Sequence, residues 1–281
     1  MQDAFAHCAE LVRTADRDRY LAALFAPAER RDALSALYAF NVEIGRVREV
    51  AREALPGEIR LQWWRDVLNG ERAGEASANP IAAALLEVVA RHRISVAKLD
   101  ALLDAHRFDL YNEPMARLAD LETYARDTST ALIALAAQIL SGADAVGVEE
   151  AADPAGIAST ITTILRAFPA HAARHQLYVP IELLSRFGAQ PQDIFTGRST
   201  HELNETFAEL RSLARQHLYP VQQGMTILPN TALPAFLPVA LVRPALDRLE
   251  RCDAFAPAEI SPWRRQWLIW RAARNPARLA A

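Results

Sequence analysis

The sequence predicts an all-α protein, and three observations lead to that prediction. The chain of 281 residues has only 10 glycines and is rich in alanine, leucine, glutamate and arginine, which are strong helix formers. No alternation of apolar and polar residues is longer than a few positions, so no strand is expected. Since 51% of the residues are hydrophobic, a large core can form. We expect one domain over residues 1–281, a helical bundle around a central cavity.

Capping and breaking residues set the limits of the helices predicted in the first half of the chain. Asp18 is expected to cap a helix, and the pair Pro56-Gly57 to break a long one that runs to Arg52. Asn79-Pro80 begins another helix after a polar loop over residues 71–79. The predicted helices are residues 3–14, 18–25, 27–52, 58–68, 80–92, 96–110 and 118–140.

A stretch over residues 161–180 dominates the second half. It begins as an apolar helix, becomes basic at Arg166, His171, Arg174 and His175, and stops at Pro180. A helix that changes from apolar to cationic along its length is typical of the wall and mouth of a pocket. Further helices are predicted over residues 153–168, 180–187, 200–224 and 262–274, with a turn at 191–196 and a proline-broken segment at 229–249.

Charge and cysteine content narrow the classes of function. A net charge of −3 gives no reason to expect a nucleic-acid partner. Cys8 and Cys252 lack the spacing of metal ligands, so both are expected to be reduced and incidental. No secretory signal opens the chain, and no apolar run reaches the roughly 20 residues of a membrane span. We therefore expect a cytoplasmic protein, with peripheral contact to the inner membrane as an option.

The last predicted helix combines aromatic and basic residues. Trp263, Trp267 and Trp270 recur at helical spacing among arginines. Two interpretations follow: the indoles dock this helix onto the bundle, or residues 259–274 contact a membrane surface.

Three segments carry a resemblance to a known family. They run from Arg19-Tyr20 to Tyr38-Ala39-Phe40, from Arg60 through Trp63-Trp64-Arg65, and from Ile164-Leu165-Arg166 to Tyr178-Val179-Pro180. In order and spacing they resemble the squalene/phytoene synthase family. That resemblance implies the all-helical isoprenoid synthase fold and a head-to-head condensation of two prenyl diphosphates that requires Mg²⁺.

The chain departs from the family at both aspartate-rich motifs, which in the family place carboxylates on facing helices as Mg²⁺ ligands. The first motif corresponds to Gly45, Arg46 and Glu49, and the second to Ala167 and His171. One carboxylate of five is left, and Glu43 lies about 120° from Glu49 around a helix. We therefore expect no catalytic residues and no metal site.

Other segments are similar to a narrower branch of that family, the mitochondrial complex I assembly factor 6 branch and its bacterial relatives. They are Ala39-Phe40-Asn41-Val42-Glu43 and Glu122-x-Tyr124-Ala125-x-x-Thr128. This resemblance implies a non-catalytic or repurposed protein that acts in respiratory complex I assembly. Its partners would be a complex I subunit and an isoprenoid-like or anionic small molecule. The alternative is an active farnesyl- or geranylgeranyl-diphosphate transferase with Mg²⁺ as cofactor.

Residues of these segments form the predicted pocket. One hypothesis is that arginine and histidine at its mouth bind an anion directly, without metal. The other is that these cations are solvated or pair with Glu43, Glu49 and Asp109; Asp109 is expected to pair with Arg166. One of the adjacent tryptophans is expected in the core and the other at a groove, or both in the core. The predicted pocket residues are Tyr38, Phe40, Asn41, Glu43, Arg46, Trp63, Trp64, Arg65, Asp109, Tyr124, Arg166, His171, Arg174 and Tyr178.

Overall fold

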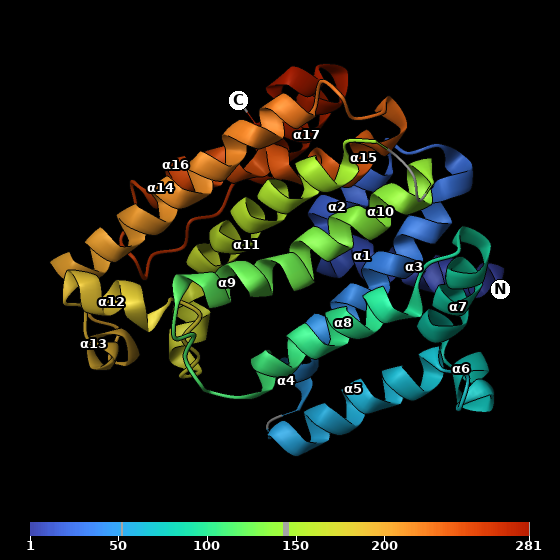
Figure 1. Cartoon of the computed structure of the whole chain (residues 1–281), viewed down its shortest axis with the longest axis horizontal. Coiled ribbons are helices and arrows are strands. Elements are labelled where there is room, and N and C mark those ends of the chain that lie inside the picture. The colour runs from blue at the N-terminus through green and yellow to red at the C-terminus, as the bar shows by residue number, and fades with distance from the viewer. Residues whose placement is uncertain (52, 143–145, 281) are drawn as a thin grey trace. The chain divides into compact units, whose positions relative to one another are not determined.

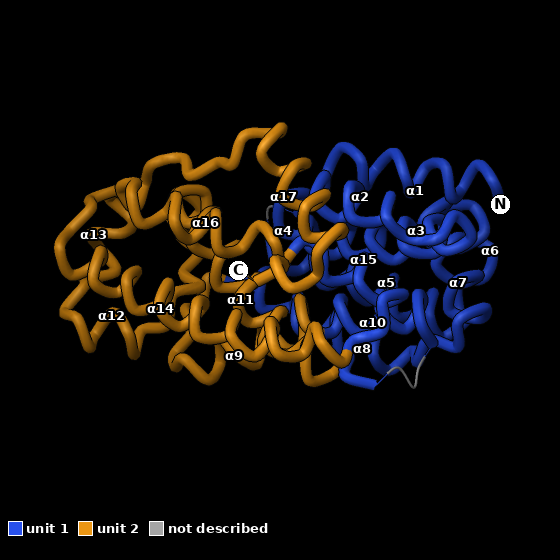
Figure 2. Tube along the Cα trace, turned by 90° about the horizontal axis from the view of Figure 1, so that it is seen from above, with its two compact units in different colours: residues 1–111, 131–148, 228–238 blue, residues 112–130, 149–227, 239–281 orange. Residues whose placement is uncertain are grey.

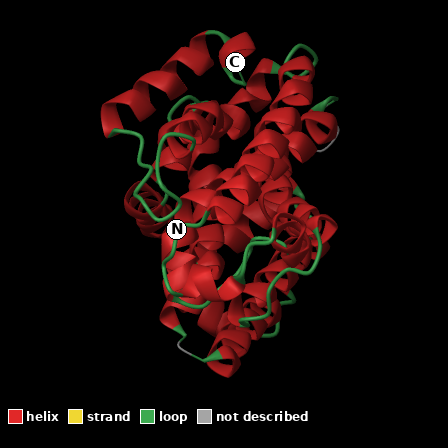
Figure 3. Ribbon diagram, turned by 90° about the vertical axis from the view of Figure 1, so that its left-hand side faces the viewer, coloured by secondary structure: helices red, strands yellow, loops and turns green. Residues whose placement is uncertain are grey.

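Helices and short connections make up the described part of the chain. The computed structural model describes residues 1–51, 53–142 and 146–280, and no strand occurs among them (Figures 1 and 3). The all-α prediction is therefore confirmed. The chain divides into two compact units, coloured blue and orange in Figure 2. Unit 1 comprises residues 1–111, 131–148 and 228–238, and unit 2 comprises residues 112–130, 149–227 and 239–281.

Unit 1 is built on three helices, α1, α3 and α7, that pack against one another, while α10 packs on α3 and α5 packs on α8. Its core includes Leu34, Leu37, Phe40, Trp64 and Leu103, all fully buried. The elements of this unit are α1 (Gln2–Ala15), α2 (Arg17–Ala23), α3 (Ala28–Gly45), α4 (Val47–Val50), α5 (Ala54–Leu68), α6 (Ala73–Ala78), α7 (Pro80–His92), α8 (Val96–Arg107), η1 (Phe108–Leu110), α10 (Ala131–Ser141), η3 (Asn230–Ala232) and α15 (Leu233–Phe236).

Several limits differ from those predicted. The long helix expected to reach Arg52 breaks at Arg46 into α3 and α4, and Arg52 itself lies outside the described residues. Pro56 and Gly57 do not break a helix; they lie inside the first turns of α5, where proline loses no hydrogen bond. Asp16, not Asp18, caps α2 by accepting a hydrogen bond from the Arg19 amide. The predicted loop over residues 71–79 contains the short helix α6.

Unit 2 is organised around α11 and α14. Its elements are α9 (Leu118–Ala125), the π-helical turn η2 (Arg126–Thr130), α11 (Val148–Ala173, whose first residue falls in unit 1), α12 (Ile181–Phe187), α13 (Pro191–Phe195), α14 (His201–Gly224), α16 (Val242–Leu249), α17 (Pro262–Arg274) and η5 (Pro276–Arg278). The 3-10 segment η4 (Leu237–Leu241) belongs in part to each unit. Phe168 of α11 packs edge-on against Phe207 of α14, with ring centroids 4.6 Å apart.

Small residues allow α11 to approach its neighbours closely. A Cβ atom at Gly156 would lie 2.0 Å from Thr130 Oγ1 and 2.5 Å from the Thr130 backbone nitrogen, so only glycine fits against η2. Thr160 of α11 also donates a 2.7 Å hydrogen bond to Ser129 Oγ in the same turn. Single π-helical turns such as η2 occur often at functional sites. The helix extends five residues beyond the predicted end at Phe168, with Pro169 inside it.

Candidate functional site

Several of the predicted pocket residues of unit 1 are aromatic side chains in its core. Phe40 of α3 and Trp64 of α5 are buried and pack edge-on, with ring centroids 4.9 Å apart. Trp63 is half-buried, and its Nε1 donates a 2.7 Å hydrogen bond to Glu75 of α6. Trp64 is therefore the core tryptophan and the alternative in which both are in the core is wrong, while a groove at Trp63 stays a prediction. Tyr38 is also buried, and burial raises its pKa although Arg19 lies over its ring.

The acidic residues at the end of α3 are paired with arginines. Glu43 forms an ion pair with Arg60 of α5. Glu49 of α4 lies 3.5 Å from Arg46, and about half of each of these two side chains is exposed. The pairing of Arg46 with Glu49 agrees with the prediction that these cations are used in ion pairs. Gly45 is exposed and Asn41 is half-buried.

A buried histidine–aspartate pair lies at the junction of α8 and η1. His106 Nδ1 is 2.7 Å from Asp109 Oδ2, and each side chain is only 10% exposed. The observed partner of Asp109 is thus His106 of the same unit, whereas the sequence predicts Arg166. His106 was not among the predicted site residues, although its spacing of three from Asp109 places the two on one helix face.

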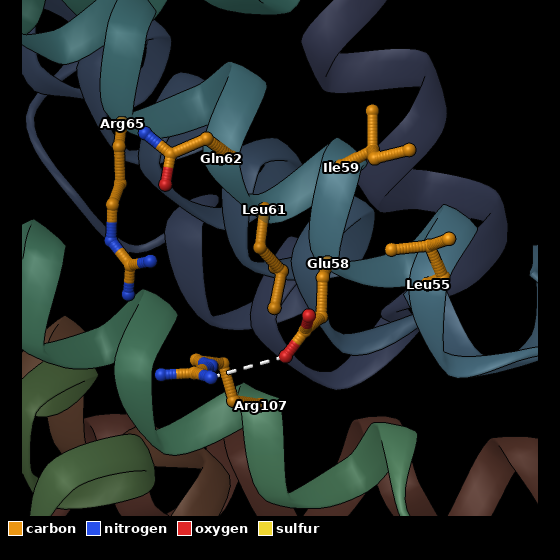
Figure 4. Close-up of a pocket in the computed structure, with 7 residues that line it drawn as sticks. All are labelled: Leu55, Glu58, Ile59, Leu61, Gln62, Arg65 and Arg107. Carbon is orange, nitrogen blue, oxygen red and sulfur yellow. Dashed lines mark hydrogen bonds and ion pairs between the residues drawn. The ribbon is translucent and has the colours of Figure 1, made fainter.

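A shallow pocket of about 340 Å³ opens between α5 and α8 (Figure 4). Its cations are already paired. Arg65 binds Asp100 at 2.7 Å and also contacts Asp104, and Arg107 lies 3.1 Å from Glu58. Hydrogen bonds from Tyr111 and Arg107 lower the pKa of Glu58. Of the pocket's lining residues, the predicted site includes only Arg65. The pocket is lined by Leu55, Glu58, Ile59, Leu61, Gln62, Arg65 and Arg107.

The predicted basic end of α11 lies in unit 2. Arg166 forms an ion pair with Glu259 at 3.1 Å, and Arg265 of α17 binds the same carboxylate at 3.2 Å. Glu259 was not predicted as a partner because it lies 93 residues from Arg166 in the chain. Arg166 therefore takes part in an ion pair within unit 2, just as Arg46 does within unit 1. Arg174 and His175 are exposed beyond the end of the helix, and His175 adopts a positive φ of 56°.

The remaining predicted residues of unit 2 meet around Tyr178. The rings of His171 and Tyr178 are 4.6 Å apart between centroids, and those of Tyr124 and Tyr178 are 5.9 Å apart. Tyr178 is buried, while His171 and Tyr124 are half-buried. Ala167 presents only a methyl group. The structure therefore brings three predicted residues of unit 2 into one aromatic cluster.

Metal-ligating side chains are dispersed. Within either unit, over the residues that the structure describes, no three histidine, cysteine, aspartate or glutamate side chains come together as a metal site would require. No helix of the described residues is long and apolar enough to cross a bilayer.

Sequence comparisons identify similar proteins across almost the whole chain. The profile described as squalene/phytoene synthase matches residues 12–271. Complex I assembly factor 6 of Rattus norvegicus is 30% identical over 251 residues, which are 89% of this chain and 75% of the rat protein. The 15-cis-phytoene synthase of Synechococcus elongatus is 24% identical over 281 residues, covering 94% of this chain and 91% of that enzyme. The two resemblances expected from the sequence are confirmed.

Solved structures show the same fold. A dehydrosqualene synthase in complex with a ligand superposes with a TM-score of 0.84 at 18% identity, covering 97% of this chain and 96% of that chain. The squalene synthase HpnC from Alicyclobacillus acidocaldarius gives a TM-score of 0.77 at 22% identity, covering 89% of this chain and 94% of that chain. These likenesses confirm the isoprenoid synthase fold.

Proposed function

Because the chain belongs to the squalene/phytoene synthase family, we propose that it is a non-catalytic or repurposed member acting in the assembly of respiratory complex I. The observation that carries the proposal is the set of residues at the positions that match the family's metal-binding aspartates. Those positions hold Gly45, Arg46, Glu49, Ala167 and His171. Neither glycine nor alanine has a ligating atom in its side chain, and arginine repels a cation.

The chemistry of the family explains why this substitution matters. A departing diphosphate is a multiply charged anion, and Mg²⁺ held by carboxylates stabilises the charge that develops on it. Here the one carboxylate left at those positions, Glu49, lies 3.5 Å from the Arg46 guanidinium. A metal ion at Glu49 would have to displace that guanidinium and would gain no second carboxylate from the same motif.

The relatives support an assembly role over a catalytic one. The rat protein named as a complex I assembly factor is 30% identical to this chain, and the Synechococcus elongatus phytoene synthase is 24% identical. The corresponding partner is a complex I subunit. The phytoene synthase match is the observation that favours the second candidate, a prenyltransferase that condenses two prenyl diphosphates. The expected cytoplasmic location stays a prediction.

A small-molecule role belongs to the same proposal. Within unit 2 the predicted site residues include the neighbouring aromatic rings of Tyr124 and Tyr178. Aromatic walls suit an isoprenoid-like chain, and the cations of α11 suit an anionic group. Titration of phosphate or farnesyl diphosphate without metal tests this part. Absence of binding at millimolar ligand would refute an anion site and leave the assembly role untouched.

Two assays separate the candidate functions. In the first, the purified chain is incubated with farnesyl or geranylgeranyl diphosphate and Mg²⁺, and the products are extracted, with the Synechococcus elongatus enzyme as positive control. We expect no condensed hydrocarbon; an EDTA-sensitive product would establish the prenyltransferase instead. In the second, the gene is deleted in its host and assembled complex I is measured on native gels. We expect a loss that the wild-type gene restores, and an unchanged amount of complex I would contradict the assembly role.

A further inference from the structure

The C-terminal helix α17 has two faces of opposite character. On one face Leu268, Ile269 and Ala272 are buried. Trp263, Trp267 and Trp270 are 82, 51 and 48% exposed. The interpretation in which the indoles dock the helix is therefore wrong, because the aliphatic side chains dock it. Trp263 is the most exposed of the large apolar side chains in the described part of the chain.

The exposed face is basic as well as aromatic. At 100° per residue, a single sector of roughly 120° holds Trp263, Arg264, Trp267, Trp270, Arg271 and Arg274. The Arg271 guanidinium lies 4.6 Å from the Trp267 ring centroid, and that of Arg274 lies 5.5 Å from the Trp270 ring centroid. These cation–π contacts hold the two charges at the level of the indoles. These six residues are called the Trp/Arg face below.

The charges of the Trp/Arg face have no carboxylate partner among the residues that the structure describes. Arginines elsewhere are repeatedly engaged, as Arg65 and Arg166 are. By contrast, no acidic side chain among the described residues lies within ion-pair distance of Arg264, Arg271 or Arg274, and α17 itself contains no acidic residue. Arg265, which does have a carboxylate partner, points to the docked side and binds Glu259. Of residues 259–274, which the sequence predicts as a membrane contact, only the Trp/Arg face from Trp263 onward is therefore suited to one.

We infer that the Trp/Arg face binds the surface of a bilayer that contains anionic phospholipids. Indole rings favour the boundary between headgroups and acyl chains, where an apolar ring with a polar N–H is best accommodated. A guanidinium forms paired hydrogen bonds with phosphate oxygens, which lie at the same depth. A short helix with buried aliphatics on one side lies in the plane of the interface and does not cross it. This surface goes beyond the proposed assembly role and does not depend on it.

Vesicle sedimentation of the full chain tests the inference. The probes are vesicles of phosphatidylcholine alone and of phosphatidylcholine mixed with phosphatidylglycerol. We expect the protein to pellet with the mixed vesicles, and the binding to weaken as ionic strength rises from about 0.01 M to 0.15 M because salt screens the arginines. A shift of tryptophan emission to shorter wavelength should accompany binding.

Two triple variants divide the contributions. Each arginine near an anionic surface contributes about 1 kcal/mol, or about fivefold in affinity, so R264Q/R271Q/R274Q should weaken binding on the order of a hundredfold. W263A/W267A/W270A should weaken it on the order of tenfold for each indole. Five of these six side chains are exposed and Arg271 is half-buried, so circular dichroism should show both variants folded.

Matched controls lie elsewhere on the surface. R117Q/R186Q/R198Q removes three exposed arginines and changes the net charge equally. Y219A removes an aromatic side chain that is 68% exposed on α14. Both should pellet like the wild type. Equal pelleting of the wild type and either α17 triple variant would overturn the inference, as would equal binding to both kinds of vesicle. A different result would show that a second copy of the chain covers this face instead. In that case the wild type would be a dimer in lipid-free buffer and would not bind vesicles, and W263A/W267A/W270A would be a monomer.

Discussion

Gly156 of α11 offers the sharpest test of how the helices of unit 2 fit together. A methyl group there would lie 2.0 Å from Thr130 Oγ1, 2.5 Å from Thr130 N and 2.6 Å from Thr130 Cα. Real Cβ contacts do not occur at these distances, and two of the three atoms are backbone atoms of η2. The Gly156→Ala variant therefore requires α11 or the π-helical turn to move, since no side-chain rotation relieves the contact.

The magnitude follows from two opposing terms. Overpacking of this kind lowers the free energy of unfolding by roughly 3 kcal/mol. The higher helix propensity of alanine raises it by up to about 1 kcal/mol, so the net decrease is about 2 kcal/mol. For a chain of 281 residues the unfolding entropy is about 0.6 kcal/mol per degree, so the melting temperature should fall by about 3 °C. Urea unfolding followed by circular dichroism, together with thermal melts, measures both quantities.

Two further variants make the Gly156→Ala result interpretable. Gly74 lies exposed in α6, and a methyl group added there would have no atom within 4 Å, so Gly74→Ala should be neutral or stabilise by about 0.5 kcal/mol. Adding Thr130→Ala to Gly156→Ala removes only the hydroxyl contact and should recover little stability, with Thr130→Ala alone as the reference. Wild-type stability of Gly156→Ala, or full recovery in the double variant, would refute the backbone argument.

Three other predictions concern groups elsewhere in the chain. Native protein treated with a maleimide should be labelled at Cys252 and not at Cys8. Cys8 is fully buried, and burial raises its pKa to about 12. Equal labelling of the two cysteines, measured by mass spectrometry, would contradict the packing of α1. Burial lowers the pKa of both His92 and His217, so the unfolded chain binds protons more readily than the folded chain. The free energy of unfolding should therefore fall as the pH drops below about 6.5. This fall should be less steep in the variants His92→Gln and His217→Gln. Arg65→Met removes the ties from α5 to two aspartates of α8 and should cost about 1 kcal/mol in urea unfolding, whereas no change would show that these ion pairs add nothing.

The sequence was sufficient for most helices and insufficient for several of their ends. Periodicity and caps identify α1, α7, α14 and α17 to within one or two residues. The break at Arg46 was missed because α3 and α4 continue the same apolar spacing, and only tertiary packing distinguishes one helix from two. Pro56 and Gly57 predict a break because both residues interrupt helices in general. In α5 a Cβ atom at Gly57 would lie 2.4 Å from Leu110 Cδ2, so the Leu110 side chain would have to move to admit it.

The ion pairs of the predicted site residues could be predicted from the sequence only in part. Spacing within one helix is local, so the pairing of Arg46 with Glu49 was foreseeable and is observed. Pairings that join distant segments are not encoded locally, and Arg166 with Glu259 was therefore missed. The sequence leaves the orientation of α17 open for a related reason. A stripe of three tryptophans is equally compatible with either orientation, and the buried aliphatic face decides between them.

The pattern of ion pairs bears directly on the proposed loss of catalysis. A site that gathers carboxylates for Mg²⁺ holds repelling charges until the metal arrives, and so requires the metal for its own stability. In unit 1 two acids near the first motif are instead paired with arginines, Glu43 with Arg60 and Glu49 with Arg46. A metal ion at either carboxylate would have to displace the arginine and leave it unpaired. These ion pairs balance the carboxylates near the first motif without a metal ion, which agrees with the proposed loss of the Mg²⁺ site.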